Sequence, residues 1–405
     1  MRKLSMVALS LVLLLTACAP NFQKQEEVVQ EKDDDTKEKA IIPKYKISDK
    51  YYRTIMPFEP GEARGMVVNN LNTRYDITEF ETGLMRIAQN TFSTDKYVFK
   101  EGQYLDGSSV ASWLEREMTP AQVEAKKKEL EAKYKKEKIN KKVVVNNLGL
   151  NPADPGKGDA HERNEKNPIY LAHILEHNYL VQSGEKDTYQ LGGIAIGLAL
   201  NSVHYYREEA YGAVFEKNIS RKVLEAEGKK IAQEVVNRLR GIDELKNVPI
   251  TIGLFEQESR SSVVPGNFFT YAEVSQGSNN IGSWKDVKEK YILFPSAEAE
   301  KDHRDDLTFF QNFKQDVEEY FPNFNGVIGK GFYLDGQLQE LNIEIPIQFY
   351  GEAEAIGFTQ YVTGLVMEHF PNYMSVQVSV SSVLGQEALI VKKPDQDEPF
   401  VHIYQ

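Results

Sequence analysis

The C-terminal half of the chain contains one short stretch of sequence twice. The first copy runs from Val317 to Val327 and reads VEEYFPNFNGV. The second copy runs from Val366 to Val376 and reads VMEHFPNYMSV. Six of the eleven positions are identical at an offset of 49 residues, and they include the central Phe-Pro-Asn. Such a match indicates an internal repeat, so each copy should belong to the same kind of structural unit.

The first copy lies between a predicted helix and two predicted strands. The helix over 307–320 should end at the Phe-Pro pair because Pro322 cannot continue it. Strands over 326–334 and 338–349 then flank Asp335-Gly336, and this dipeptide between alternating apolar residues is a strong hairpin signal.

The second copy has the same surroundings. A helix over 353–370 again ends at Phe-Pro, and strands over 373–384 and 388–393 flank a turn at Gly385-Gln386. Residues 219–274 show a third, more diverged version of the pattern. Because a helix–strand–strand unit cannot bury its helix alone, the units should pack side by side as an antiparallel sheet with helices on one face. The predicted fold class is therefore α+β.

The N-terminal half reads as a mixture of helices and strands. Its patterns predict helices over 76–92, 119–138, 168–181 and 219–239, strands over 51–56, 64–71 and 190–206, and a loop over 147–165. The run QLGGIAIGLALNSVHYY at 190–206 should be a core strand. Its Gly192, Gly193 and Gly197 indicate bulges or the close approach of another backbone.

The helix at 120–138 is unusually rich in Lys and Glu. Thr119-Pro120 provides an N-cap residue followed by a proline at the first helical position. We expect a solvated helix with ion pairs between residues four apart. A basic surface that faces a membrane is the alternative.

The composition excludes several classes of protein. The 405 residues are 41% hydrophobic and 27% charged, which is an ordinary globular balance. The net charge of −12 argues against a nucleic-acid-binding protein, which should carry a basic excess. A single cysteine, Cys18, can form neither an intramolecular disulfide nor a cysteine-rich metal site.

The first residues predict a secretory signal that ends at Cys18. Arg2 and Lys3 precede an apolar run over 6–15, which is shorter than the about 20 residues that a spanning helix needs. Leu15-Thr16-Ala17-Cys18 matches the bacterial lipobox, in which the cysteine sulfur receives a diacylglyceryl group before cleavage. We therefore expect a chain held at the outer face of the cell membrane by a lipid on Cys18.

The expected domains follow the chain in order. They are a signal peptide over 1–17, the lipidated cysteine and a disordered acidic tether over 18–48, an N-terminal α+β domain over 49–245, and a C-terminal domain over 246–405 with repeat units at 303–349 and 353–393. The tether prediction depends on a polar, mixed-charge composition that cannot bury enough apolar surface to fold. A solvated helix is the alternative for this segment.

One motif points to an enzyme. His173, Glu176 and His177 form H-x-x-E-H, the signature of inverted zinc metallopeptidases, in which two histidines hold Zn²⁺ and the glutamate activates water. On a helix over 168–181, however, the three side chains would face solvent, opposite Leu171 and Leu175. The preferred reading is therefore surface histidines beside a glutamate, with a zinc metallohydrolase as the alternative.

Other searches for chemistry favour no enzyme class. The sequence has no nucleophile elbow, phosphate loop or dinucleotide fingerprint. Asp302, His303, Asp305 and Asp306 are interpreted as a charged helix start near a positive helix dipole. No cofactor and no metal are predicted.

The lipobox, the acidic tether, the 190–206 strand and the paired Phe-Pro-Asn units together resemble the CamS family of Gram-positive lipoproteins associated with sex-pheromone biosynthesis. The resemblance implies that a short apolar peptide preceding the lipidated cysteine is released and trimmed. The corresponding residues here are Leu11, Val12, Leu13, Leu14, Leu15, Thr16 and Ala17.

The resemblance supplies no catalytic residues. This agrees with the motif searches, and we expect folded domains that are non-catalytic binding modules for an unknown surface or protein partner, besides the membrane contact through Cys18. A solute-binding lipoprotein of a transporter is a second alternative, which would require two lobes with parallel sheets.

Overall fold

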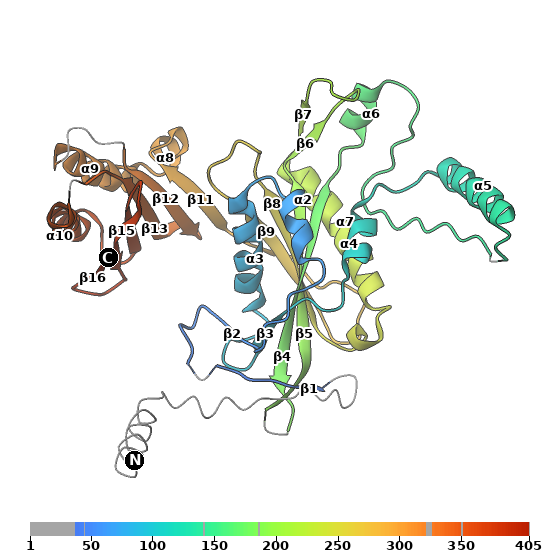
Figure 1. Cartoon of the computed structure of the whole chain (residues 1–405), viewed down its shortest axis with the longest axis horizontal. Coiled ribbons are helices and arrows are strands. Elements are labelled where there is room, and N and C mark those ends of the chain that lie inside the picture. Colours follow the sequence, from blue (N-terminus) through green and yellow to red (C-terminus); the bar gives the residue numbers. More distant parts are fainter. Residues whose placement is uncertain are drawn as a thin grey trace, which may run out of the picture.

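The computed structural model describes residues 37–43, 45–140, 142–184, 187–320, 326–349 and 351–404. Within these ranges, the chain forms an eight-stranded sheet, a six-stranded sheet and a small two-stranded sheet. Figure 1 shows the six-stranded sheet and its helices beside the larger sheet, with the C-terminus in the smaller unit. The α+β fold class predicted from the sequence is confirmed.

The larger sheet has the strand order β10-β9-β8-β5-β4-β3-β2, and β1 pairs with β5. Its strands are β1 (Lys37–Lys39), β2 (Arg53–Thr54), β3 (Val98–Glu101), β4 (Leu171–Gln182), β5 (Thr188–Asn201), β8 (Ile250–Gln257), β9 (Asn267–Val274) and β10 (Lys285–Asp286). Strands β2 and β3 are parallel, β5 and β8 are parallel, and the other pairs are antiparallel.

The topology places the domain boundary later than the sequence patterns do. β8 pairs along its whole length with β5, and β9 pairs with β8. The predicted division between residues 245 and 246 therefore falls inside the larger sheet. The short helix η2 (Asp243–Leu245) only connects α7 to β8. The link between the two large sheets lies instead between β10 and β11, which begins at Glu289.

Helices cover both faces of the larger sheet. α3 (Arg74–Ala88) buries Phe80 and Leu84 against one face. α4 (Gly107–Leu114) and α7 (Arg221–Leu239) bury Trp113 and Ile231 against the other face. The predicted helices over 76–92 and 219–239 are confirmed, because each carries a regular apolar stripe that one face of the sheet buries.

The predicted helix over 168–181 is wrong, because this segment is strand β4. It lies between β3 and β5, with helices on both sides of the sheet. A strand whose two faces are both buried loses the apolar–polar alternation that marks a half-exposed strand. The remaining apolar run then mimics a buried helix.

Two further segments differ from their predictions. Residues 64–71 form the short helices η1 (Arg64–Met66) and α2 (Val67–Asn70) instead of a strand, and one helical turn places Val67 against the α3 core. The predicted tether over 18–48 is ordered at its end, because β1 adds to the edge of β5 near Thr188. Backbone hydrogen bonds to β5 thus order a segment whose composition predicted disorder. The expected strand over 51–56 is reduced to β2.

The core strand over 190–206 is confirmed as β5 and β6 (Val203–Tyr206), and β6 pairs with β7 (Phe215–Asn218). The bulge predicted from its glycines is confirmed at Gly192, because Tyr179 pairs with Gly193 and Leu180 pairs with Leu191. Gly193 and Gly197 mainly make room for aromatic rings. A Cβ added to Gly197 would lie 2.8 Å from Cε2 of Phe80. One added to Gly193 would lie 2.3 Å from Cε1 of Phe92. The packing of α3 therefore depends on glycine in β5.

The Lys-rich helix is α5 (Pro120–Glu137), and Figure 1 shows it projecting away from both sheets. Thr119 and Gln122 form a capping box at its start, and no residue of the helix is buried. Lys128 pairs with Glu124 at 3.7 Å, as expected for a solvated helix. The predicted loop over 147–165 is wrong at its end, where residues from Ala160 onward form a short helix, α6 (Ala160–Lys166), with Asp159 as its N-cap. None of the described helices combines the length and apolar composition needed to cross a bilayer.

The smaller sheet has the order β11-β12-β13-β14-β15-β16. Its strands are β11 (Glu289–Phe294), β12 (Ile328–Leu334), β13 (Gln337–Pro346), β14 (Ser375–Ser382), β15 (Gly385–Lys392) and β16 (Phe400–Ile403). α8 (Ala297–Asp302), α9 (Arg304–Tyr320) and α10 (Glu352–His369) complete the unit. Asp305 and Asp306 occupy the first turn of α9, as predicted for a charged helix start, whereas Asp302 ends α8 and His303 is the C-cap of that helix.

The helix–strand–strand repeat is confirmed as α9-β12-β13 and α10-β14-β15. β13 and β14 are parallel, however, and not antiparallel as predicted. The reason is topological: α10 connects these neighbouring strands across one face of the sheet, and such a crossover makes them parallel. The first Phe-Pro-Asn, at 321–323, lies outside the described residues. The third pattern, α7-β8-β9, has the predicted order but belongs to the larger sheet.

The two predicted turns of the repeat have different outcomes. Asp335-Gly336 joins β12 to β13 with positive φ values of 50° and 80°, as the sequence predicts. The second turn is made by Val383 and Leu384, and not by Gly385-Gln386, which already pair in β15. Val383 and Leu384 are almost fully exposed at the tip of this hairpin.

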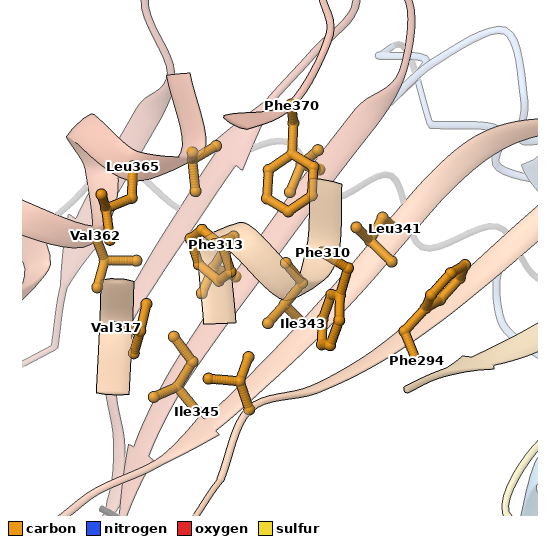
Figure 2. Packing of buried hydrophobic residues seen from close by; sticks show 14 of the residues in the cluster. Phe294, Phe310, Phe313, Val317, Leu341, Ile343, Ile345, Val362, Leu365 and Phe370 are labelled. Carbon is orange, nitrogen blue, oxygen red and sulfur yellow. The ribbon is translucent and has the colours of Figure 1, made fainter. Parts of the chain in front are cut away.

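The core of the smaller unit is an aromatic and aliphatic layer between one face of its sheet and the two long helices. Phe310 and Phe313 come from α9, Val362 and Leu365 come from α10, and Ile343 comes from β13. Figure 2 shows these side chains pointing toward one another. Helices on one face of a sheet were predicted from the repeat, and this arrangement is confirmed. The two parallel-sheet lobes required of a transporter's solute-binding lipoprotein are not found in the described ranges.

A buried lysine holds the end of α10. Lys392 in β15 has no exposed surface, and its Nζ donates to the carbonyl oxygens of Phe370 at 3.1 Å and Pro371 at 2.6 Å. Burial lowers the pKa of Lys392. The ammonium lies at the C-terminal end of the helix dipole, where a cation is favourable. It therefore stabilises the helix end at the second Phe-Pro-Asn.

Replacing Lys392 by methionine should lower the free energy of unfolding by about 1–3 kcal/mol. Methionine fills similar space but leaves two buried carbonyl groups without donors. Urea denaturation of the variant and the parent measures this difference. Lys393→Met is the matched control. Lys393 is the exposed neighbour of Lys392, so its replacement should leave the free energy of unfolding unchanged. Equal midpoints for Lys392→Met and the parent would show that the ammonium contributes nothing.

The two sheet units also meet through side chains. Arg86 of α3 donates to Glu289 of β11 through Nε and Nη2, each at 2.7 Å. Tyr291 of β11 donates to Glu79 of α3 at 2.6 Å. Most of this cluster is buried, so the orientation of the smaller sheet depends on charged groups.

Candidate functional site

A pocket of about 360 Å³ opens at the edge of the larger sheet. It lies where β3 ends at Glu101 while its neighbour β4 continues toward Leu171. Its walls come from the segment 61–68, from α3, from the loop after β3 and from β4. The notch therefore arises because one strand of the sheet is shorter than the next.

The three residues of the H-x-x-E-H motif all line this pocket. They lie on a strand, so His173 and His177 point to one face of the sheet and Glu176 points to the other. The His177 ring meets Phe99 edge-on at 4.9 Å, and the carboxylate of Glu176 accepts from the amide of Leu105 at 2.8 Å. The predicted exposure of these side chains on a helix is thus wrong, since all three are buried.

The strand geometry also bears on the zinc alternative. Residues four apart on a strand are separated by about 13 Å, whereas two ligands of one zinc ion each lie about 2 Å from the metal. His173 and His177 consequently cannot share an ion as they would on a helix. Among the described residues, no three His, Cys, Asp or Glu side chains come together as a metal site.

Burial keeps both histidines neutral. It lowers the pKa of His173 to about 4 and the pKa of His177 to about 3. Nδ1 of His173 lies 3.1 Å from the side-chain amide of Asn70. Nδ1 of His177 is buried and has no hydrogen-bond partner in the described part of the chain. The pocket is thus lined by an imidazole with one nitrogen, Nδ1, that has no partner among the described residues.

Glu176 has a structural role that the motif does not suggest. Its carboxylate accepts from the consecutive backbone amides of Gln103, Tyr104 and Leu105, at distances from 2.8 to 3.3 Å. Burial raises the pKa of Glu176, and these hydrogen bonds oppose the rise. The glutamate therefore fixes the loop that forms the floor of the pocket.

Gly102 permits this arrangement. Its amide donates to the carbonyl oxygen of Glu176 at 3.1 Å. An added Cβ would lie 2.5 Å from Cβ of Glu176, a distance at which one of the two backbones must move. Only glycine allows β4 and the loop to approach so closely.

Gly102→Ala should therefore cost about 1–3 kcal/mol of stability, the usual range for overpacking a filled site. The midpoint of urea denaturation is the measurement. Gly65→Ala is the control, because a Cβ at this position meets nothing within 4 Å. An unchanged midpoint for Gly102→Ala would mean that the loop relaxes without cost.

Charged side chains surround the mouth of the pocket. Glu101 accepts from Arg64 Nη1 at 2.8 Å and from the amide of Gly61 at 2.7 Å, so it ties the segment 61–68 to the sheet. Glu81 of α3 also lines the pocket. Burial raises the pKa of Glu81, Arg64 lowers it, and the negative charge of Glu101 raises it further.

Comparison with known proteins identifies the family. The family of the CamS sex pheromone cAM373 precursor matches residues 58–398. The chain belongs to the CamS family of sex pheromone precursors. No curated protein sequence matches it.

Two solved CamS structures resemble the chain over most of its length. A sex pheromone precursor from Lactobacillus salivarius is 31% identical, with a TM-score of 0.77 over 90% of this chain and 99% of that one. The C-terminal domain of the sex pheromone staph-cAM373 precursor from Staphylococcus aureus is 32% identical, with a TM-score of 0.69 over 83% and 98%. The family resemblance expected from the sequence is confirmed.

The lipidation site and the peptide lie outside the described residues. Cys18 and the stretch from Leu11 to Ala17 therefore stay predictions from the sequence.

Sequence reasoning also missed three residues of the pocket, namely Arg64, Glu81 and Glu101. They come from an expected strand, an expected helix face and the end of a short strand, so no local spacing connects them. The sequence feature that could have located the pocket was the presence of three polar residues, His173, Glu176 and His177, within an apolar run.

Proposed function

We propose that this CamS protein is a cell-surface lipoprotein with two products. Cleavage before Cys18 leaves the folded chain anchored by lipid at the outer face of the membrane. The residues from Leu11 to Ala17 provide a short apolar pheromone peptide. The observation that carries the proposal is the family match combined with a lipobox directly after this apolar stretch.

The anchor is tested by replacing the lipidated residue. Cys18→Ser removes the sulfur that receives the diacylglyceryl group, so labelled palmitate should no longer enter the protein. Because more than one acyl chain is needed for stable attachment, the variant should also leave the membrane fraction. Incorporation of label into Cys18→Ser at the parent level would refute lipidation at this position.

The peptide is tested separately with synthetic LVLLLTA. It should induce a conjugative response in a responder strain, and a scrambled peptide of the same composition is the control. In the producing strain, Leu13→Asp should abolish the activity of the culture medium, although secretion of the folded chain must first be verified. Inactivity of LVLLLTA with every responder would remove the pheromone proposal and leave the anchor proposal intact.

For the folded region, we propose a non-catalytic binding role centred on the pocket at the end of β3. The support is a pocket with apolar walls and a few converging polar groups, which is typical of ligand sites. The zinc alternative is tested by metal analysis of the purified chain and by His173→Ala. Stoichiometric zinc that is lost in this variant would favour a hydrolase instead.

A further inference from the structure

The pocket at the end of β3 has the dimensions of a small-molecule site. Its volume of about 360 Å³ lies within the usual range for ligand pockets. At the roughly 30 Å³ that a water molecule occupies in the liquid, it holds on the order of a dozen heavy atoms. A whole seven-residue peptide does not fit, whereas one apolar group with a polar head does.

The interior walls of the pocket are mainly hydrophobic. They are formed by Val67, Ile77, Phe80, Leu105 and Val110, from both sides of the notch. Phe80, Leu105 and Val110 are buried in the folded chain, so their positions are set by packing. Such walls favour an apolar body on the ligand.

The polar groups of the pocket favour a positive charge. Of its three carboxylates, Glu176 is occupied by three backbone amides, and Glu101 is occupied by Arg64 and Gly61. Glu81 is half-buried and makes no hydrogen bond with the residues that the structure describes, although the charge of Arg64 attracts it. A carboxylate in such surroundings gains from a cationic partner.

An anion fits this site poorly. Arg64 is the sole cationic side chain among the lining residues that the structure describes, and its Nη1 is already bound to Glu101. A bound carboxylate or phosphate would meet the negative charges of both Glu81 and Glu101. Like charges at short range are costly where water is largely excluded.

We propose that this pocket binds a primary ammonium group carried on a small apolar body, with the ammonium against Glu81 and the apolar part against the partly exposed Val67 and Ile77. The ammonium belongs either to a free amine or to the N-terminal residue of an apolar peptide. The inference rests on the proposed binding role of the folded region, and it adds the class of ligand.

Calorimetric titration of the full chain tests the charge requirement. Hexylamine should bind, whereas hexanol and hexanoate, which have the same chain length, should bind at least tenfold more weakly. Peptide LVLLLTA with a free N-terminus, compared with its acetylated form, distinguishes a peptide end from a free amine. Binding of hexylamine or of the free peptide alone supports the proposal, and failure of both overturns it.

Variants at one position make the test specific. Glu81→Gln should weaken amine binding at least tenfold and leave the urea midpoint nearly unchanged, since glutamine loses the attraction of Arg64 but also the repulsion of Glu101. Glu81→Lys should abolish amine binding and strengthen hexanoate binding. Glu62→Gln is the matched control, because Glu62 is exposed and does not line the pocket.

Two outcomes separate this inference from the proposed function. If hexanol or hexanoate binds better than hexylamine and Gly102→Ala weakens that binding, the binding role stands and the cationic ligand is wrong. Equal amine affinity in the parent and in Glu81→Gln also overturns the proposal, because the ammonium then does not contact this carboxylate.

Discussion

Arg86→Ala should lower the free energy of unfolding by about 3–5 kcal/mol, the largest loss that we expect from a single substitution in this chain. Arg86 lies between two buried acids. Its Nη2 also donates to Glu79, whose side chain is 6% exposed, while Glu289 is 5% exposed. Removal of the guanidinium leaves two carboxylates facing each other with little water to screen them.

The surroundings of Arg86 show why the charge matters. Burial lowers the pKa of Arg86, but the hydrogen bond to Glu289 and the negative charge of Glu79 outweigh burial and leave this pKa raised. The pKa of Glu79 is raised by burial, against the opposing effect of Arg86. The guanidinium also lies over the ring of Phe332 at 4.9 Å, which adds a contact with the second strand of the smaller sheet.

Urea denaturation with Arg74→Ala as control measures the loss, because Arg74 is an exposed residue on the same helix. Arg86→Lys should be intermediate, since an ammonium cannot make the two parallel bonds to Glu289. Replacing the cluster together, as Arg86→Met with Glu79→Leu and Glu289→Leu, should recover much of the stability. A triple variant as unstable as Arg86→Ala would mean that shape, and not charge, dominates this contact.

The same cluster connects the two sheets. Its disruption in Arg86→Ala should therefore make the two sheet units unfold in separate transitions. In the parent chain, α3 packs on the larger sheet and binds β11 of the smaller one. Two transitions in the Arg86→Ala variant, against one in the parent, would indicate this uncoupling. The prediction follows because cooperativity between units requires interactions that cross their boundary.

Much of the helical structure could be predicted because its signals are local. α3 and α7 carry apolar stripes at helical spacing, and α5 begins with a capping box at Thr119. The repeat added a signal of another kind, since two matching Phe-Pro-Asn stretches gave the helix–strand–strand order directly. Each of these features depends on neighbours within a few residues, which a single sequence contains.

Strand β4 and the pocket could not be predicted for the opposite reason. β4 becomes a strand because β3 and β5 lie on either side of it, and those strands come from residues 98–101 and 188–201. The pocket depends on where β3 ends, and its mouth combines Arg64, Glu81 and Glu101. The residues of the His173–His177 motif line this pocket from a strand and do not form the helical zinc site that the motif suggests.

His177 should make the folded chain sensitive to acid. In the folded state burial lowers its pKa to about 3, whereas an unfolded histidine titrates near about 6.5. Between these values the unfolded chain binds a proton that the folded chain does not. The stabilisation from the neutral imidazole is therefore complete above about pH 6.5 and is lost progressively as the pH falls toward 3.

The expected size of this effect is about 3 kcal/mol between pH 6.5 and 4, from about 1.4 kcal/mol for each unit of pH. His177→Phe removes the titrating group, and an aromatic ring can still meet Phe99. The difference in unfolding free energy between variant and parent should move by this amount in favour of the variant as the pH falls. Urea denaturation at half-unit intervals of pH measures it.

The unfolding free energy of His177→Phe must be compared with that of the parent chain, because other buried groups also titrate between pH 6.5 and 4. Burial also lowers the pKa of His173 and His204 to about 4, so both add to the acid sensitivity. The raised pKa values of Glu79 and Glu176 act in the opposite sense, since their folded forms hold protons more tightly. These contributions are shared by parent and variant and largely cancel in the difference.

The control is His402→Phe, at an exposed position in the edge strand β16. The same measurement on this variant shows what the removal of an exposed histidine does. A change for His177→Phe no larger than that of the control would show that His177 is charged in the folded chain at pH 4. The imidazole would then need water or an anion inside the pocket, and the pocket would be wetter than its apolar walls imply.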